Sequence, residues 1–288
     1  METAAILVPM RACRTACMPS AGFGGGEAAS NVKASWPAGR RYLAKEITMQ
    51  LRSSLLFTTA LGLLAGSAQA LTFTTEDYPP FNMFEQKKVT GISTEILQEA
   101  TKRAGVTITI ELLPWERALN MAKTQADVCV YSAVRTPERE KSFKWVGPLV
   151  ADQISLFALT SSPIKLASVA DAKKYKVGAY NGDAYGDFVE KQGIKLERVV
   201  TDTQNLPKLT SGRIDLWVAG ANSGPYKAAR EGMKGGIKPV LAVGDPKDSQ
   251  MYLACNPGVG DDVIAKLNDA IKAMDKDGTS AKLSAKYK

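Results

Sequence analysis

The chain has 288 residues, of which 45% are apolar and 23% charged, which is ordinary for a folded protein and sufficient for a sizeable core or two lobes. It contains no histidine, which excludes a histidine-based catalytic triad and any zinc site that relies on imidazole. The formal net charge is +8, and seven Lys/Arg and three Asp/Glu lie in residues 1–70. Residues 71–288 therefore carry 30 Lys/Arg and 26 Asp/Glu, a net charge of +4. The remaining lysines are scattered among acids, so the sequence predicts no nucleic-acid partner.

The first 70 residues predict an export leader that is separate from the fold. Residues 1–48 are rich in Ala, Gly, Pro and Arg without periodicity, and we expect a non-native or disordered extension. Met49–Ala70 has a short basic start, an apolar core and a small-residue end, the pattern of a secretory signal peptide. Its apolar run is shorter than the about 20 residues of a membrane span, so an uncleaved anchor is the weaker alternative. We therefore expect export to the periplasm, with Met49 as the initiator.

From residue 71 onward, strands and helices alternate. The first group begins with a strand at 71–75, an amphipathic helix at 92–104 and a strand at 106–112. A helix at 115–123, opened by Pro114, and a short apolar strand at 126–132 complete it. A second group continues with strands at 154–159, 175–180, 196–200, 214–219 and 237–243 and helices at 185–192, 205–210 and 225–231. A last strand and helix follow at 251–255 and 264–274. This alternation predicts an α/β protein with parallel sheets and right-handed crossovers.

The run 112–150 carries the main candidate binding residues. Arg135 and Arg139 follow the end of an apolar strand, which is the side of an open α/β sheet where ligands bind. A guanidinium presents a planar fork of donors that matches a carboxylate or phosphate, so these arginines favour a small anionic ligand. The alternative is a solvated turn in which Glu138 and Glu140 pair with Arg139, and spacing alone favours that alternative.

The segments DYPPF, WERAL, RTPERE and FKWVGPLV, in this order, resemble the extracytoplasmic solute-binding proteins of family 3, the polar amino-acid type. The family pattern of [ST]-x-x-R, then a phenylalanine and a segment like S-x-P, is filled by Thr136, Arg139, Phe143, Gly147 and Pro148. The resemblance covers nearly all of residues 71–288. It implies a two-lobed type II periplasmic-binding-protein fold, with a mostly parallel sheet flanked by helices in each lobe and a ligand cleft between them.

The resemblance also implies how the chain is divided and what it does. We expect the first lobe at 71–158, the second at 159–249 and a return to the first at 250–288. The implied function is a periplasmic binding protein that captures a small polar or carboxylate-bearing solute by lobe closure and delivers it to a membrane ABC permease. We expect a monomer without cofactor, metal or enzymatic activity. Two alternatives stay open: an enzyme on this fold, such as a cyclohexadienyl-type dehydratase using Glu76 or Asp183, and a sensory binding module.

By the same resemblance, Arg139 aligns with the arginine that holds the carboxylate of an amino-acid ligand. Tyr78 matches the family's aromatic residue at the cleft mouth, although the adjacent prolines explain it equally well as core. Trp115 could stack on a ligand, although a tryptophan that starts an amphipathic helix is more often packing. Further candidates near these positions are Arg117, Ser132 and Arg135.

Two positions depart from the family pattern. At the turn 181–184 the family often has a hydroxyl that contacts the carboxylate, whereas this chain has Asp183, in a turn whose N–H groups would form an anion site. The acid that binds the amino group falls about five residues beyond an aspartate in the family, and counting from Asp215 gives Gly220. We therefore expect that the ligand is not a simple neutral α-amino acid. Asp183, Asn222 or Glu76 could supply the compensating polarity, and each is also explained as a turn former or surface residue.

Two cysteines, Cys129 and Cys255, fall in the expected fold. An oxidising compartment would permit them to pair. Both lie in apolar strand-like runs, where a free cysteine behaves as a small buried hydrophobe, and we expect free thiols rather than a bridge. Cys13 and Cys17 lack a second ligand pair, so they predict no metal site.

Overall fold

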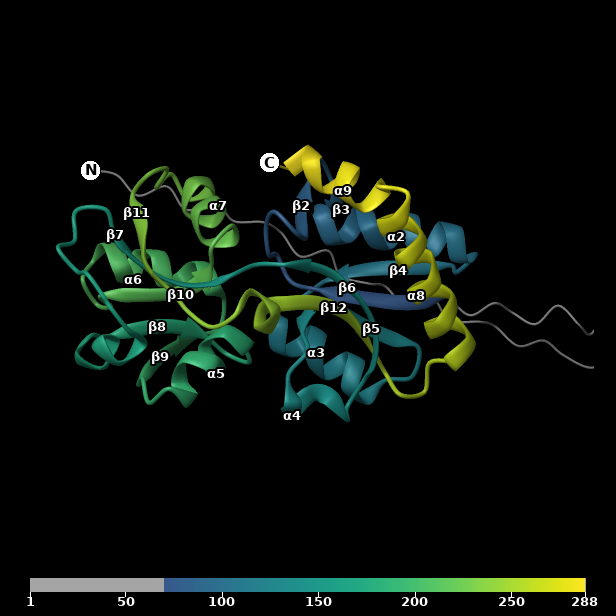
Figure 1. Ribbon diagram of the computed structural model, residues 1–288, viewed down its shortest axis with the longest axis horizontal. Helices are drawn as coiled ribbons and strands as arrows, with labels where there is room; N and C mark the ends of the chain where they lie inside the picture. The colour runs from purple at the N-terminus through teal and green to yellow at the C-terminus, as the bar shows by residue number, and fades with distance from the viewer. Residues whose placement is uncertain (1–69, 288) are drawn as a thin grey trace, which may run out of the picture. The chain divides into compact units, whose positions relative to one another are not determined.

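The computed structural model describes residues 70–287 (Figure 1). The expected extension at 1–48, and the signal peptide at 49–70 up to its last residue, lie outside the described residues and stay predictions. Within 70–287, none of the helices has the length and apolar character that a membrane crossing requires. In the same range, no three His, Cys, Asp or Glu side chains are grouped so that they could hold a metal ion.

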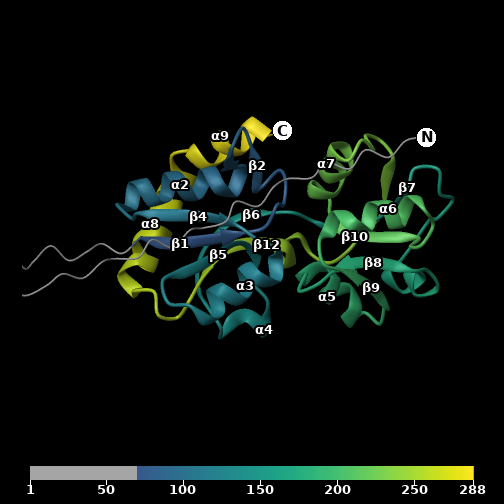
Figure 2. The same cartoon turned by 180° about the vertical axis from the view of Figure 1, so that it is seen from behind.

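The first lobe is built on a five-stranded sheet in the order β4-β1-β5-β12-β6. Its strands are β1 (Leu71–Thr75), β4 (Ile108–Leu112), β5 (Val128–Val134), β6 (Lys144–Ala151) and β12 (Gln250–Cys255). Its helices are α2 (Ile92–Ala104), α3 (Trp115–Thr124), α4 (Pro137–Glu140), α8 (Asp261–Lys276) and α9 (Thr279–Ser284). A hairpin of β2 (Met83–Glu85) and β3 (Lys88–Thr90) precedes α2. Helices α2, α8 and α9 cover one face of the sheet and α3 covers the other (Figures 1 and 2).

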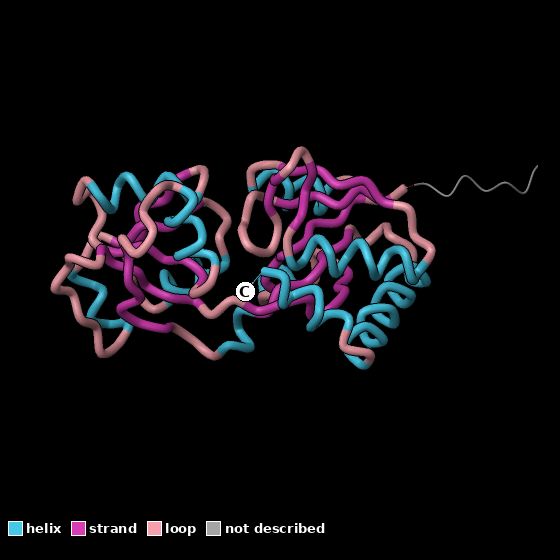
Figure 3. The backbone as a smooth tube through the Cα atoms, turned by 90° about the horizontal axis from the view of Figure 1, so that it is seen from above, coloured by secondary structure: helices cyan, strands magenta, loops and turns pink. Residues whose placement is uncertain are grey.

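The second lobe has a five-stranded sheet in the order β11-β7-β10-β8-β9. Its strands are β7 (Ile154–Leu159), β8 (Val177–Tyr180), β9 (Leu196–Val199), β10 (Leu216–Gly220) and β11 (Ile237–Ala242). Its helices are α5 (Ala184–Lys191), α6 (Asn205–Thr210) and α7 (Ser223–Arg230). Seen from above, the two lobes are separate groups of strands and helices joined by crossing segments (Figure 3).

The local patterns explain most of these elements. Strand β5 alternates its side chains, since Cys129 and Tyr131 join the core under α2 and α8 while Val128 and Val130 join the core under α3. Helix α2 ends at Gly105, whose φ of 67° is the left-handed conformation that glycine adopts readily. The expected strands and helices are all present, with bounds that differ by three residues or fewer. Strand β6, the hairpin of β2 and β3 and the short helices α4 and α9 were not predicted.

Both sheets are mixed, because each has two parallel and two antiparallel pairings. Strand β7 enters the second lobe from the first, and β12 returns the other way. A strand that enters a lobe starts at the edge of the sheet that faces the other lobe. Strands β5 and β10 end at that same edge of their sheets, so β12 runs antiparallel to β5 and β7 runs antiparallel to β10. The crossings therefore account for the antiparallel pairs in sheets that were expected to be mostly parallel.

The chain changes sheet earlier than the expected boundary at residue 158. Strand β7 pairs with β10 and β11 in the second sheet, so the outward crossing lies between the end of β6 at Ala151 and the start of β7 at Ile154. An apolar strand of six residues fits the interior of either sheet, and its sequence does not reveal its partners. Strand β12 then lies in the first sheet, between β5 and β6.

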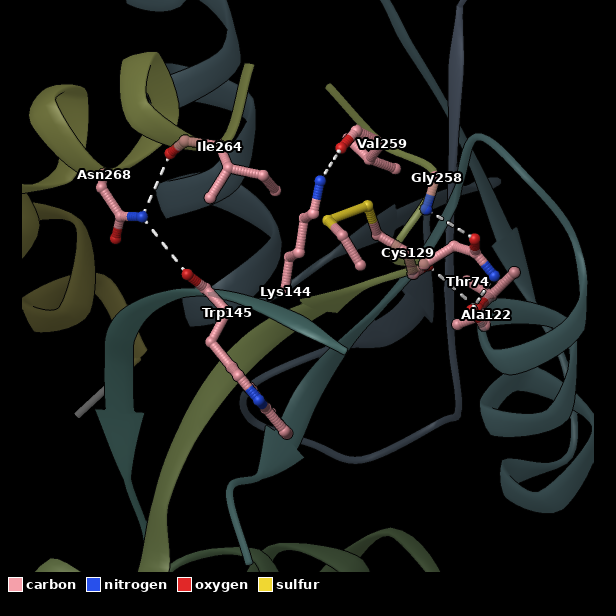
Figure 4. The surroundings of a disulfide bond; sticks show 11 residues. Thr74, Ala122, Cys129, Lys144, Trp145, Gly258, Val259, Ile264 and Asn268 are labelled. Atoms are coloured by element: carbon pink, nitrogen blue, oxygen red, sulfur yellow. Dashed lines mark hydrogen bonds between the residues drawn. A yellow bond between two sulfur atoms is a disulfide. The ribbon is translucent and has the colours of Figure 1, made fainter. Parts of the chain in front are cut away.

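Cys129 and Cys255 form a disulfide, so the expectation of free thiols is wrong (Figure 4). The two residues are direct partners in the antiparallel register of β5 and β12. They lie 126 residues apart in sequence, and only the pairing of those strands brings them together. The bridge ties the returning strand to β5, and next to it the Lys144 side chain donates to the carbonyl of Val259.

Candidate functional site

A small cavity lies where the two lobes meet; we call it the central cavity. Its volume is about 20 Å³, which is room for one water molecule. The first lobe contributes Glu76, Tyr78, Trp115, Ser132, Val134, Arg139 and Met251 to its wall, and the second contributes Tyr180, Asp183, Ala184 and Tyr185. Six of the nine residues that the sequence singled out are therefore brought together here.

The strand order explains why these residues converge. Glu76 follows the end of β1, and Ser132 lies near the end of β5. In the second lobe, Tyr180 ends β8 and Asp183 follows it. Parallel strands bring their carboxyl ends to one edge of a sheet, and in these two lobes those edges face each other.

Arg139 lies on the short helix α4 and is buried. Its guanidinium donates to the carbonyl of Val134 at 3.1 Å and, across to the second lobe, to the carbonyl of Gly182 at 2.7 Å. It also stacks on Trp115, with its Cζ 5.5 Å from the centroid of the indole. Burial lowers the pKa of Arg139, opposed by the negative charge of Asp183. The arginine is thus a desolvated cation at the cavity wall, and the solvated-turn alternative is wrong for it.

The solvated ion pair of this turn is formed by Arg135 instead. The guanidinium of Arg135 donates to both oxygens of the Glu140 carboxylate, at 2.7 and 2.5 Å, and this pair is exposed. Glu138 instead pairs with Lys191 of the second lobe. Arg135 also lies over the ring of Trp145 and does not reach the central cavity. Of the two arginines that leave β5, only Arg139 turns inward.

Two other candidates also lie outside the cavity wall. Helix α3 buries Trp115, Ala118, Leu119 and Ala122, and this places Arg117 on the exposed face of the helix. Asn222 precedes α7, where its backbone N–H and its side-chain amide both donate to Asp152. Asn222 therefore ties α7 to the crossing segment rather than facing the cavity.

Two acidic residues line the cavity, Glu76 from the first lobe and Asp183 from the second. Glu76 accepts a hydrogen bond of 2.8 Å from the Tyr180 hydroxyl of the other lobe. Solvent reaches part of Glu76, but protein atoms surround its carboxyl group, and this burial raises its pKa to about 8 against the opposing charge of Lys227. Burial, followed by the nearby charge of Asp202, raises the pKa of Asp183 to about 7. At neutral pH, Glu76 is therefore mostly uncharged.

The turn after β8 is not an open anion site, in contrast to the expectation. Asp183 itself accepts from the backbone N–H groups of Tyr185 and Gly186, at 3.0 and 2.8 Å, and so caps α5. The outward-facing group of this turn is the carbonyl of Gly182, which accepts from Arg139 and from the Trp115 indole at 2.8 Å. The turn therefore presents an acceptor to the first lobe.

The structure also explains why position 220 is glycine. A Cβ on Gly220 would lie 1.8 Å from Oδ2 of Asp152, so no larger residue fits. The Asp152 carboxylate accepts from the backbone N–H groups of Asn222 and Ser223, at 2.8 and 3.1 Å, at the start of α7. An acid is therefore present at the end of β10, but the crossing segment supplies it. Asp152 is buried and does not line the central cavity.

A second pocket adjoins the central cavity; we call it the outer pocket. It has a volume of about 250 Å³ and lies between the lobes, with Glu76 and Trp115 lining both spaces. Its other walls are Asp77, Leu112, Leu113 and Pro114 of the first lobe and Val200, Thr201, Asp202 and Thr203 of the second. A solute held at Arg139 would therefore have room to extend past Glu76.

Sequence reasoning missed several residues of this region. Tyr180 and Tyr185 flank the turn at Asp183, so the turn itself was a signal for them. Met251 comes from the returning strand, and its approach depends on the pairing of β12 with β5. Lys227 had no signal, because a lysine in a short helix usually lies on a solvated face, whereas here it is almost fully buried next to Asp202.

Comparisons with known proteins agree with this architecture. Residues 71–288 match the family model of bacterial extracellular solute-binding proteins, family 3. The L-cystine-binding protein TcyJ of Escherichia coli (strain K12) is 25% identical over 214 residues, which cover 73% of this chain and 79% of that protein.

Among solved structures, an ancestral arginine-binding protein bound to arginine has a TM-score of 0.67 at 22% identity, covering 76% of this chain and 97% of that one. A histidine kinase sensor domain with similarity to periplasmic binding proteins has a TM-score of 0.69 at 20% identity, covering 76% and 96%. At these identities, the structural likenesses establish the fold, which is the two-lobed type II periplasmic-binding-protein fold. With this fold and a family match over residues 71–288, the chain belongs to the bacterial extracellular solute-binding proteins of family 3.

Proposed function

We propose that the protein captures a small carboxylate-bearing solute between its lobes, with the carboxylate on Arg139. The observation that carries this proposal is the set of contacts that the buried Arg139 guanidinium makes. Its two hydrogen bonds go to backbone carbonyls, and no carboxylate of residues 70–287 forms an ion pair with it. A buried guanidinium is normally paired with an anion. A solute carboxylate supplies that anion and fits the planar fork of donors.

Lobe closure is the second part of the proposal. The central cavity holds about one water molecule, so a solute the size of an amino acid enters only when the lobes separate. The lobes meet through direct bonds that a solute could replace, above all those of Arg139 and Trp115 to Gly182. Ion pairs of Glu138 with Lys191 and of Asp77 with Arg230 join the lobes at the rim. These exposed pairs favour closure without setting the choice of solute.

The solute is amino-acid-like in size but not a simple neutral α-amino acid. The names of the relatives support the size, since they bind cystine and arginine. The position of the ammonium-binding acid is occupied by Gly220, and Asp152 in its place is bonded to the start of α7. An α-ammonium buried without a partner is strongly disfavoured.

The proposal extends to the setting of the protein. It is a periplasmic monomer that passes its solute to a membrane ABC permease, without a cofactor and without catalysis. The relatives named as binding proteins support this over the dehydratase alternative. The sensory alternative rests on a structural likeness at 20% identity, which concerns the fold alone.

A thermal-shift screen of small carboxylic acids, followed by calorimetry of the hits, tests this function. Ligands that bind the folded state raise the melting temperature by mass action. We expect hits among small carboxylates, with binding lost in Arg139→Ala and retained in Arg135→Ala, the exposed arginine four residues earlier. Hits confined to amines or sugars, or equal loss in both variants, would contradict the proposal.

A further inference from the structure

Lys227 holds a buried ammonium group in the second lobe. It lies on α7, and its side chain is 1% exposed, as against 4% for its partner Asp202. Its Nζ donates to Oδ2 of Asp202 at 2.7 Å, while the other oxygen of Asp202 accepts from the indole N–H of Trp217 at 2.8 Å. The ion pair is therefore almost fully buried, and both oxygens of the Asp202 carboxylate accept a hydrogen bond.

Two tyrosine rings complete the surroundings of this ammonium. Nζ of Lys227 lies 3.9 Å from the ring centroid of Tyr78, which belongs to the first lobe, and 6.0 Å from that of Tyr180. A carboxylate with aromatic faces is the arrangement by which proteins bind a free ammonium group. We call Asp202, Tyr78 and Tyr180 the ammonium box.

The ammonium box shares its walls with the proposed solute site. Tyr78 and Tyr180 both line the central cavity, and Asp202 lines the outer pocket. Glu76 lines both spaces and accepts a hydrogen bond from the Tyr180 hydroxyl. It also lies close to Lys227, because the charge of the lysine opposes the rise in the pKa of Glu76. The box is therefore part of the cleft, and the chain fills it with its own side chain.

We propose that Lys227 takes the place of a solute ammonium, so that the captured solute is a small carboxylate with no ammonium on its α-carbon, such as a 2-hydroxy or 2-oxo acid. This inference rests on the proposed function, because it takes the carboxylate on Arg139 as given. An α-ammonium at the same tyrosines would meet two buried cations, Lys227 and Arg139, and no free acid at position 220. A hydroxyl or oxo oxygen carries no charge, and the protonated carboxyl of Glu76 can donate to it.

Matched solutes test the inference on the wild-type protein. Each carbon skeleton is measured by calorimetry as its 2-hydroxy, 2-oxo and 2-amino acid: lactate, pyruvate and alanine; 2-hydroxyglutarate, 2-oxoglutarate and glutamate; phenyllactate, phenylpyruvate and phenylalanine. We expect the best oxygen-bearing acid to bind at least about tenfold tighter than its amino acid. Tighter binding of the amino acid, lost in Arg139→Ala, would overturn the role of Lys227 and leave the capture of a carboxylate on Arg139 standing; for alanine or phenylalanine it would also overturn the exclusion of neutral α-amino acids. Absence of binding by every acid would count against both.

Variants of Lys227 provide the second test. Lys227→Ala empties the box and leaves the Asp202 carboxylate unpaired, so the preference should move toward the amino acid by about tenfold or more. Methylammonium or ethylammonium should raise the melting temperature of this variant and leave unchanged that of the wild type and of Lys208→Ala, a matched control whose lysine pairs with Glu197 nearer the surface. An unchanged preference and no rescue would overturn the inference. If Lys227→Ala does not fold, the solute preference of Lys227→Met and the comparison of matched solutes on the wild-type protein decide.

Discussion

The guanidinium of Arg139 donates a hydrogen bond of 2.7 Å to the carbonyl oxygen of Gly182, across the boundary between the two lobes. The Trp115 indole donates to the same oxygen at 2.8 Å. One carbonyl of the second lobe thus accepts two donors of the first, next to the central cavity. Under the proposed function, a carboxylate that takes the Nη2 donor of the guanidinium competes with this bond, so we expect solute binding and the contact between the lobes to be coupled at Gly182.

Gly182 should therefore be sensitive to substitution. Its φ is 68°, and a Cβ would lie 3.2 Å from Cγ of Glu116 and 3.3 Å from Cδ1 of Trp115, both in the first lobe. We expect Gly182→Ala to lower the unfolding free energy by about 1 kcal/mol through its left-handed backbone, and to weaken solute binding as well. The control is Gly232→Ala, where φ is 78° but no atom lies within 4 Å of the new Cβ. Denaturant titration and calorimetry of both variants check this; equal solute affinity in the two would refute it.

The raised pKa of Glu76 predicts a pH dependence of stability. A carboxyl whose pKa rises from 4.5 unfolded to about 8 folded binds its proton more tightly in the folded state. Its stabilising contribution is therefore complete below about pH 4.5 and falls as the pH rises toward 8. The pKa of Asp183, raised from 3.8 to about 7, acts in the same direction over a lower pH range.

Unfolding free energies measured from pH 5 to 8 should decrease more steeply in the wild type than in Glu76→Gln. Glu231→Gln, at the exposed end of α7, is the control, and parallel curves for the wild type and Glu76→Gln would argue against the assignment.

The disulfide between Cys129 and Cys255 should contribute substantially to stability. It closes a loop of 126 residues and joins the returning strand to β5. Replacement of both cysteines by alanine should lower the unfolding free energy by about 2–5 kcal/mol, because the open chain gains conformational freedom when it unfolds. Denaturant titrations of the double variant and of the oxidised protein measure this difference. Two reactive thiols in the unfolded, unreduced protein would show that the bridge is not formed.

Export is predicted from the sequence alone. The small-residue end of Met49–Ala70 predicts cleavage before Leu71, and secretion into an oxidising compartment agrees with the disulfide. Intact-mass measurement of the protein from the periplasmic fraction should therefore give the mass of residues 71–288. A protein that retains residues 49–70, or that stays with the membranes, would contradict the prediction.

Local patterns predicted the parts of the molecule that depend on neighbouring residues. The spacing of apolar residues located the helices and strands, and the rule that ligands gather at strand ends made Arg135 and Arg139 candidates, although spacing alone favoured a solvated turn. Asp183 was recognised as a turn residue because it lies between the predicted strand at 175–180 and the predicted helix at 185–192. The resemblance to the family then placed these positions in one cleft between two lobes, where the structure shows them.

Long-range pairing explains what the sequence did not reveal. Lys227 is buried only because Asp202, 25 residues earlier, and Tyr78 of the other lobe surround it. Asp152 fills the space beside Gly220 because the crossing segment passes the end of β10. The bridge of Cys129 depends in the same way on a strand that returns more than 100 residues later. None of these contacts leaves a periodic pattern in the chain.

The central claim is that Arg139 holds the carboxylate of the solute, and calorimetric titration of Arg139→Ala tests it most directly. With the best ligand of the screen, the loss of a buried bidentate pair should weaken binding by about 2–5 kcal/mol, or roughly 30-fold to several thousand-fold. Arg139→Lys should recover only part of this, since a point charge does not reproduce the fork, while Arg135→Ala should bind like the wild type within about 0.5 kcal/mol. Near-equal affinities of the wild type, Arg139→Ala and Arg139→Lys would contradict the account.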